Sequence, residues 1–110
     1  MDALLRTKIL VGLLEAAKMS HEASVLAGNW KTPRSDTDLL SALSFQVEKA
    51  AQVEDKNIPS SKFHECTVFE EQLADLVIVA LDMAMGRNLL LATAILYKLD
   101  YNLSKARVVN

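Results

Sequence analysis

The sequence contains very little cysteine, proline or glycine, and each shortage excludes a class of protein. Its one cysteine, Cys66, excludes an intrachain disulfide and a zinc site built from several thiolates. Two prolines and three glycines leave few turn positions in a chain rich in Leu and Ala, which favours helices over a β-sandwich or barrel. The longest charge-free apolar run, residues 88–97, is far shorter than the ~20 residues that span a bilayer.

The chain also lacks a large excess of positive or negative charge. The formal net charge is −2, so no basic surface for nucleic acid or for an anionic membrane is expected. The first residues, MDALLRTK, carry an acid and lack a cleavable signal pattern, which predicts a cytoplasmic location. Hydrophobic residues make up 51% of the chain and charged residues 24%, a composition typical of a globular protein. We expect residues 1–110 to form a single domain.

Four helical segments follow from apolar spacing and from capping residues. The first covers residues 3–27, and the second begins at Ser35 or Asp36 and fades in the polar stretch EDKNIPSSKFHE. A Thr67–Glu70 capping box begins the third, which ends at Gly86. Asn88 is expected to cap the fourth, which runs to about residue 105. The pattern predicts an all-α four-helix bundle in which helices three and four form a central antiparallel hairpin.

The third segment carries an acidic stripe. At about 100° per residue, Asp75 lies about 40° and Asp82 about 20° from Glu71, so all three carboxylates share one face of the helix. In the fourth segment, Lys98 and Asn102 also share one face. Two interpretations fit this arrangement. A half-buried ion-pair network would tie the two helices together, whereas a metal-and-phosphate site would use the same groups as ligands.

Two stretches carry a resemblance to a known family. Residues 64–105, HECTVFEEQLADLVIVALDMAMGRNLLLATAILYKLDYNLSK, resemble the C-terminal half of the MazG family of all-α nucleoside triphosphate pyrophosphohydrolases. The segment SHEASVLAGNWK resembles the entry region of small MazG-like proteins. The matching positions of the longer stretch are Glu71, Leu73, Ala74, Asp75, Asp82, Gly86, Lys98, Tyr101 and Asn102.

The resemblance implies a reaction and a set of ligands. Members of the family cleave between the α and β phosphates, releasing a nucleoside monophosphate and pyrophosphate, with Mg²⁺ activating the attacking water. On this basis Glu71, Asp75 and Asp82 would hold the metal, and Lys98 and Asn102 would hold the phosphates of a nucleoside triphosphate or related small molecule. The resemblance also implies a homodimer or homotetramer.

The chain departs from the family at its metal site. Four carboxylates normally form an ExxE pair on the second helix and an ExxD pair on the third. Here the ExxD pair falls on Gln72 and Asp75, and the ExxE pair falls on Gln46 and Lys49. A Gln is a poorer Mg²⁺ ligand than a carboxylate, and Lys49 would bring positive charge to the metal position. Glu48 or Glu54 could replace a lost ligand.

Two aromatic side chains complete the candidate pocket. His21 lies on the apolar stripe of the first segment, where a histidine with one hydrogen bond in the core is the simpler interpretation. Trp30 would be a lid over the core or a platform for a nucleobase. The candidate pocket residues are therefore His21, Trp30, Gln46, Lys49 and Gln72.

Two functions remain open, and no catalytic residue is assigned. The first is a Mg²⁺-dependent nucleoside triphosphate pyrophosphohydrolase whose metal site is partly lost, so that Mg²⁺ binds weakly or not at all. The alternative is a catalytically inactive MazG-like helical protein that binds a nucleotide or other ligand, or acts as an oligomeric interaction module.

Overall fold

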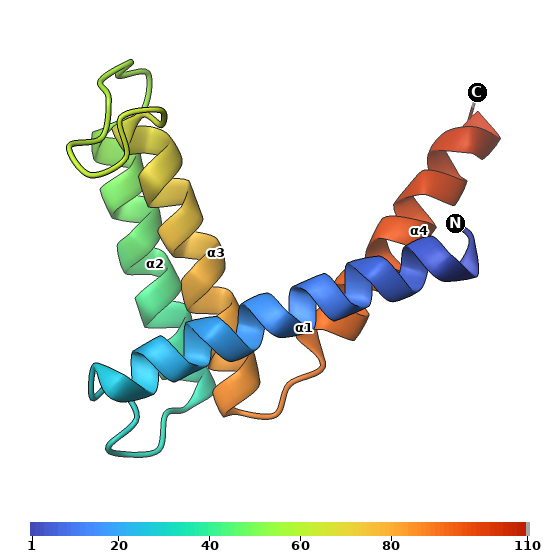
Figure 1. The fold of residues 1–110 in the computed structure, drawn as a ribbon, viewed down its shortest axis with the longest axis horizontal. Coiled ribbons are helices and arrows are strands. Elements are labelled where there is room, and N and C mark those ends of the chain that lie inside the picture. Colours follow the sequence, from blue (N-terminus) through green and yellow to red (C-terminus); the bar gives the residue numbers. More distant parts are fainter. Residues whose placement is uncertain (110) are drawn as a thin grey trace.

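Four helices account for most of the chain, as the sequence predicts (Figure 1). The structure, a computed structural model, describes residues 1–109, with side chains up to residue 107. The helices are α1 (Ala3–Leu26), α2 (Asp36–Gln52), α3 (Val68–Gly86) and α4 (Leu91–Val109). Within the described residues there is no β-strand, only an isolated bridge between Pro59 and Thr67. The all-α class is confirmed.

Capping residues set where two of the helices begin. The Thr67 side chain accepts a hydrogen bond from the Glu70 backbone N–H at 3.1 Å, and the Glu70 carboxylate accepts from the Thr67 N–H at 2.8 Å. Ser35 and Asp38 form the same reciprocal pair at the start of α2. Each box satisfies backbone donors that the first turn leaves without a partner. The Thr67–Glu70 capping box predicted from the sequence is confirmed.

The turn between α3 and α4 differs from its prediction. α3 ends at Gly86 as expected, but α4 begins only at Leu91, so the connection is longer than the sequence indicates. Asn88 does not cap α4, and that prediction is wrong. Its backbone is left-handed, with φ 56°, a conformation that Asn tolerates better than most residues. Asn88 therefore turns the chain rather than starting the helix.

The helices form two arms that diverge from a common junction (Figure 1). α3 packs against α1 on one side and α2 on the other. α4 does not follow α3 back along its length; it turns away and packs against α1 (Figure 1). Asp100 of α4 accepts from the Arg6 guanidinium at 2.5 Å and lies 3.4 Å from the N-terminal ammonium group of Met1. The predicted hairpin of helices three and four is therefore not confirmed within one chain.

The core is small and centred on α3. Met83 is completely buried, and the other buried hydrophobic residues of the described chain are Ala17, Ala50, Leu81, Ala84, Ala92 and Leu96. Most of these side chains are small, so they bring the helices close together without filling a wide interior. Many large apolar side chains remain exposed, including Val77 on α3 and Leu90 just before α4, at 54% and 77%.

Candidate functional site

Asp82 is the best-enclosed carboxylate of the acidic stripe, and side chains of the protein bind it. The residue is 6% exposed on α3. Its Oδ1 accepts a hydrogen bond from Trp30 Nε1 at 2.9 Å and lies 2.9 Å from His21 Nδ1, which donates when it carries a proton. The His21 and Trp30 rings meet edge to face, with centroids 5.0 Å apart. Groups of the protein therefore already bind Oδ1 of this buried carboxylate, as expected for a charge inside a protein.

This cluster joins three segments that are far apart in the sequence. His21 comes from α1, Trp30 from the following loop and Asp82 from α3. The sequence pattern predicts Asp82 as a metal ligand and the two aromatic residues as pocket residues, but it does not link them. The indole ring of Trp30 packs directly against the backbone of Gly86, because a Cβ added at Gly86 would lie 2.3 Å from the ring. Only glycine leaves room for the ring at that distance.

Glu71 is bound to the loop that precedes α3. Its Oε1 accepts a hydrogen bond from the Ser60 hydroxyl at 2.7 Å. Ser60 is 2% exposed, and its Oγ accepts in turn from the backbone N–H groups of Lys62 and Phe63 at 3.2 Å each. Glu71 thus anchors the connection between α2 and α3. The sequence signal for Ser60 was weak, because a serine after Pro59 in a polar loop is ordinary.

Asp75 is the remaining carboxylate of the stripe. It is half-buried and makes no side-chain hydrogen bond or ion pair with the other described residues. A helix rises 1.5 Å per residue, so Glu71 and Asp82 are separated by about 16 Å along α3. That separation exceeds what two carboxylate side chains and two metal–oxygen bonds of ~2 Å can span. Among residues 1–107, no three His, Cys, Asp or Glu side chains are grouped closely enough to hold a metal ion.

Two amides occupy the positions where the resemblance implies metal-binding carboxylates. Gln46 lies on α2 and Gln72 on α3, and these two helices pack together. The Oε1 atoms of both side chains are buried and have no hydrogen-bond partner among the described residues. Lys49 lies with its ammonium group 5.5 Å from the centroid of the exposed Phe45 ring. The lysine thus contacts an aromatic surface and supplies no hydrogen bond to Gln46.

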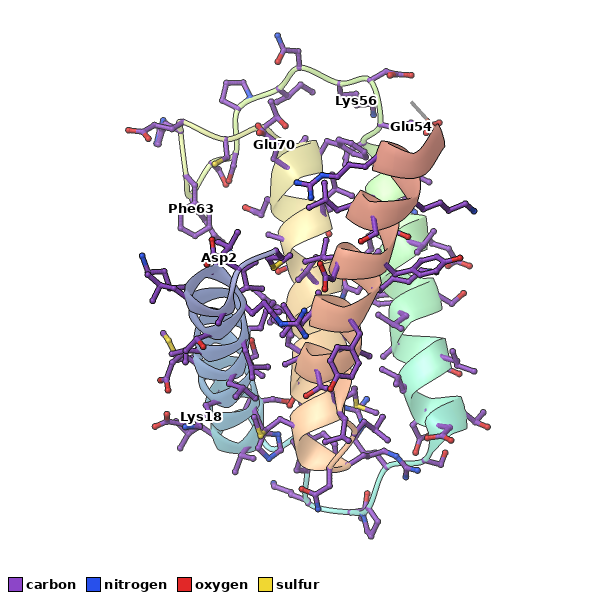
Figure 2. All side chains as sticks on the ribbon, turned by 90° about the vertical axis from the view of Figure 1, so that its right-hand side faces the viewer. Asp2, Lys18, Glu54, Lys56, Phe63 and Glu70 are labelled. Atoms are coloured by element: carbon purple, nitrogen blue, oxygen red, sulfur yellow. The ribbon has the colours of Figure 1, made fainter. Side chains whose placement is uncertain are left out.

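The remaining candidate residues lie apart from the stripe. Lys98 and Asn102 are exposed on α4, which packs against α1, and the Lys98 ammonium group lies 5.2 Å from the Tyr101 ring centroid. Within one chain they are not brought to the carboxylates of α3. Glu48 is exposed on α2, and Glu54 lies past the last turn of that helix, near Lys56 and the first turn of α3 (Figure 2).

None of the described helices is long and apolar enough to cross a membrane. Comparisons with models of known protein families, with curated proteins and with solved structures found no match to this chain.

Proposed function

We propose that this protein is a MazG-like helical protein that no longer carries out Mg²⁺-dependent pyrophosphohydrolysis and that acts as a homo-oligomeric module. The observation that carries the proposal is the state of the acidic stripe. Asp82 is bound by Trp30 and His21, and Glu71 is bound by Ser60. Asp75 is left as the only member of the stripe without a protein partner among the described residues. One carboxylate is too few for a two-metal reaction.

The ligand set does not fit Mg²⁺ well. Mg²⁺ demands octahedral oxygen coordination at 2.0–2.1 Å and is normally held by one or two carboxylates, waters and substrate phosphates. At the positions that the resemblance aligns with metal-binding carboxylates, α2 and α3 carry the neutral amides of Gln46 and Gln72. Lys49 is one helical turn from Gln46 and would repel a cation there. We therefore assign no reaction step to a metal ion.

One observation keeps hydrolysis as a second candidate function. The Oε1 atoms of Gln46 and Gln72 are enclosed without donors among the described residues, and a buried carbonyl oxygen normally has a partner. Amide oxygens are accepted ligands of divalent cations. A cation held by these amides and by Asp75 would satisfy both orphaned atoms. The family's reaction would then require Lys98 and Asn102 to approach from elsewhere, because α4 of the same chain lies against α1.

The oligomeric part of the proposal is supported by surface area. The chain exposes 7997 Å², whereas a compact monomer of 12.1 kDa exposes about 6,000 Å². Its radius of gyration is 16.1 Å, against about 13 Å for a compact domain of this length. The excess of about 2,000 Å² lies within the area that one subunit of an obligate homodimer buries. Contact with a second copy of the chain would bury this excess surface.

The shape of the chain indicates which surfaces would meet. Large apolar side chains are exposed on α3 and just before α4, among them Val77 at 54% and Leu90 at 77%. A groove of about 350 Å³ at the junction is bounded by Leu39 and Leu43 of α2, Ala80 of α3 and the residues before α4. We propose that the contact between α3 and α4, predicted within one chain, is made between two copies.

Thermal unfolding with and without Mg²⁺ tests the loss of the metal site. We expect Mg²⁺ to leave the unfolding temperature of the wild type and of Asp75→Asn unchanged. A variant carrying Gln46→Glu, Lys49→Glu and Gln72→Glu rebuilds the four-carboxylate pattern. We expect Mg²⁺ at 10- to 100-fold above its Kd to stabilise that variant by about 1.4–2.7 kcal/mol. A comparable gain in the wild type that Asp75→Asn abolishes would favour the hydrolase instead.

A further inference from the structure

A cavity of about 440 Å³ lies between the α1–α2 connection and the end of α3. It is lined by residues 30–34, which connect α1 to α2, and by Gly86 and Arg87 at the end of α3. Its size is within the range of small-molecule sites, which is roughly 300–1,000 Å³. The cavity is widely open to solvent, so a ligand can enter without rearrangement of the fold.

The charge of this cavity is opposite to that of the whole protein. Three of its lining residues, Lys31, Arg34 and Arg87, are cations, and none is acidic, although the chain has a net charge of −2. Arg87 is already neutralised, because its Nη2 lies 2.9 Å from the carboxylate of Asp36. Its Nη1 donates to the backbone carbonyl of Arg34 at 2.6 Å, which holds the loop against the end of α3.

Two of the cations form no ion pair within the described chain, although the pKa of the nearby Asp38 carboxylate is lowered by its hydrogen bonds with Ser35 and, to a smaller extent, by the charge of Arg34. Lys31 and Arg34 make no ion pair with the described residues. The nearby Asp38 carboxylate is occupied at the start of α2, where it accepts from the Ser35 backbone N–H at 2.7 Å. The Arg34 guanidinium lies 5.5 Å from the centroid of the Trp30 ring. Lys31 and Arg34 therefore line the cavity together with Thr32, which carries a hydroxyl group.

The aromatic wall of the cavity is fixed in place before any ligand binds. Trp30 Nε1 donates to the buried Asp82, and the indole ring lies against Gly86, where no side chain fits. The Trp30 ring in turn positions Arg34. Groups held in place by the fold lose little freedom on binding, which favours affinity.

We infer that this cavity binds a small phosphate-bearing anion through Lys31 and Arg34. The guanidinium plane of arginine matches the geometry of phosphate oxygens, and lysine adds a point charge. The residues differ from Lys98 and Asn102, to which the family resemblance assigns phosphates. The inference also does not depend on the proposed function, because none of its cationic ligands belongs to the acidic stripe and no metal is required.

Titration of the full chain with inorganic pyrophosphate in Mg²⁺-free buffer tests this inference. Trp30 is the only tryptophan, so its emission reports on the cavity wall. We expect a saturable change in emission and, by calorimetry, one binding event per chain. Lys31→Gln and Arg34→Gln should each weaken binding roughly tenfold, the loss of one charge-assisted contact. Lys18→Gln, on the outer side of α1 (Figure 2), removes the same charge elsewhere and should leave affinity unchanged.

Removal of the Arg34 guanidinium can change Trp30 emission without any ligand, because the two groups lie 5.5 Å apart. Calorimetry therefore measures the affinity of the Arg34 variant. Sulfate at matched ionic strength separates phosphate recognition from general screening of charge. Binding that is non-saturable, that sulfate reproduces in full, or that both cavity variants retain would overturn the inference. A bound pyrophosphate together with absent Mg²⁺ stabilisation would support the cavity and the proposed loss of the metal site separately.

Discussion

At the scale of the residue, Asp82 and Asp75 have opposite surroundings on the same helix. Asp82 is buried and bound by two side chains, whereas Asp75 has no protein partner among the described residues. We expect Asp82→Asn to lower the free energy of unfolding by about 1–3 kcal/mol, because the donors of Trp30 and His21 lose a charged acceptor. Asp75→Asn is the matched control and should change it by less than ~0.5 kcal/mol. Chemical denaturation measures both, and equal losses would contradict this account.

Gly12 and Gly86, which both lie within helices, allow a second matched pair of substitutions. A Cβ at Gly86 would lie 2.3 Å from the Trp30 ring, whereas one at Gly12 meets nothing within 4 Å. We expect Gly86→Ala to destabilise the protein by about 1–3 kcal/mol through overpacking. Gly12→Ala should stabilise it by about 0.5–1 kcal/mol, since glycine disfavours a helix interior. Stability of Gly86→Ala equal to that of the wild type would mean that Trp30 lies elsewhere.

The Asp82 cluster shows why part of the site could not be predicted from the sequence. Each of its residues stands out through a local pattern only. Asp82 interrupts an apolar run, His21 lies on an apolar stripe, and Trp30 is an aromatic residue in a loop. Their contact depends on α1 crossing α3 and on the loop returning to Gly86, which are tertiary features. The pairing of Glu71 with Ser60 was missed for the same reason, because a loop serine carries no periodic signal.

At the scale of the element, the start of α2 has a pH-dependent contribution. The pKa of Asp38 is lowered from its ordinary value of 3.8, chiefly by its hydrogen bond with the Ser35 backbone N–H and next by that with the Ser35 side chain. The ionised carboxylate therefore stabilises the folded state fully above the unfolded pKa. That contribution is lost as pH falls through the lower pKa of the folded state.

Asp38→Asn gives the measurement of this effect. We expect the wild type to be more stable than the variant between pH 5 and 8, by an amount that is constant across that range. The difference should shrink below about pH 4 and disappear when Asp38 is protonated in both states. Thermal unfolding across this pH series is the test. A difference that grows in acid would show that the capping box is not formed.

The sequence predicts a helix boundary well where a capping side chain determines it. It predicts the boundary poorly where the backbone conformation determines it. Thr67 and Ser35 lie at the predicted starts of their helices. Asn88 was expected to cap but takes a left-handed turn, which lengthens the connection and turns α4 away from α3. Periodicity shows that a segment is an amphipathic helix, but it does not state which neighbour covers the apolar face.

At the scale of the whole molecule, the large exposed surface predicts an oligomer. Light scattering at micromolar concentration should give at least twice the chain mass of 12.1 kDa. Leu90→Glu places a charge on the most exposed residue of the proposed interface and should shift the protein towards monomer. Met19→Glu, at 70% exposure on α1, is the matched control and should leave the mass unchanged. A wild type that is strictly monomeric would contradict the proposed association.

Whether this protein hydrolyses nucleoside triphosphates decides between the two candidate functions. The decisive measurement is pyrophosphate release from a panel of canonical and modified nucleoside triphosphates, with and without Mg²⁺. Because the carboxylates of α3 are bound by protein groups or isolated, we predict no Mg²⁺-dependent release above that of a buffer control. Sustained Mg²⁺-dependent turnover at about 1 s⁻¹ or faster, abolished by Asp75→Asn, would contradict the account and establish the hydrolase.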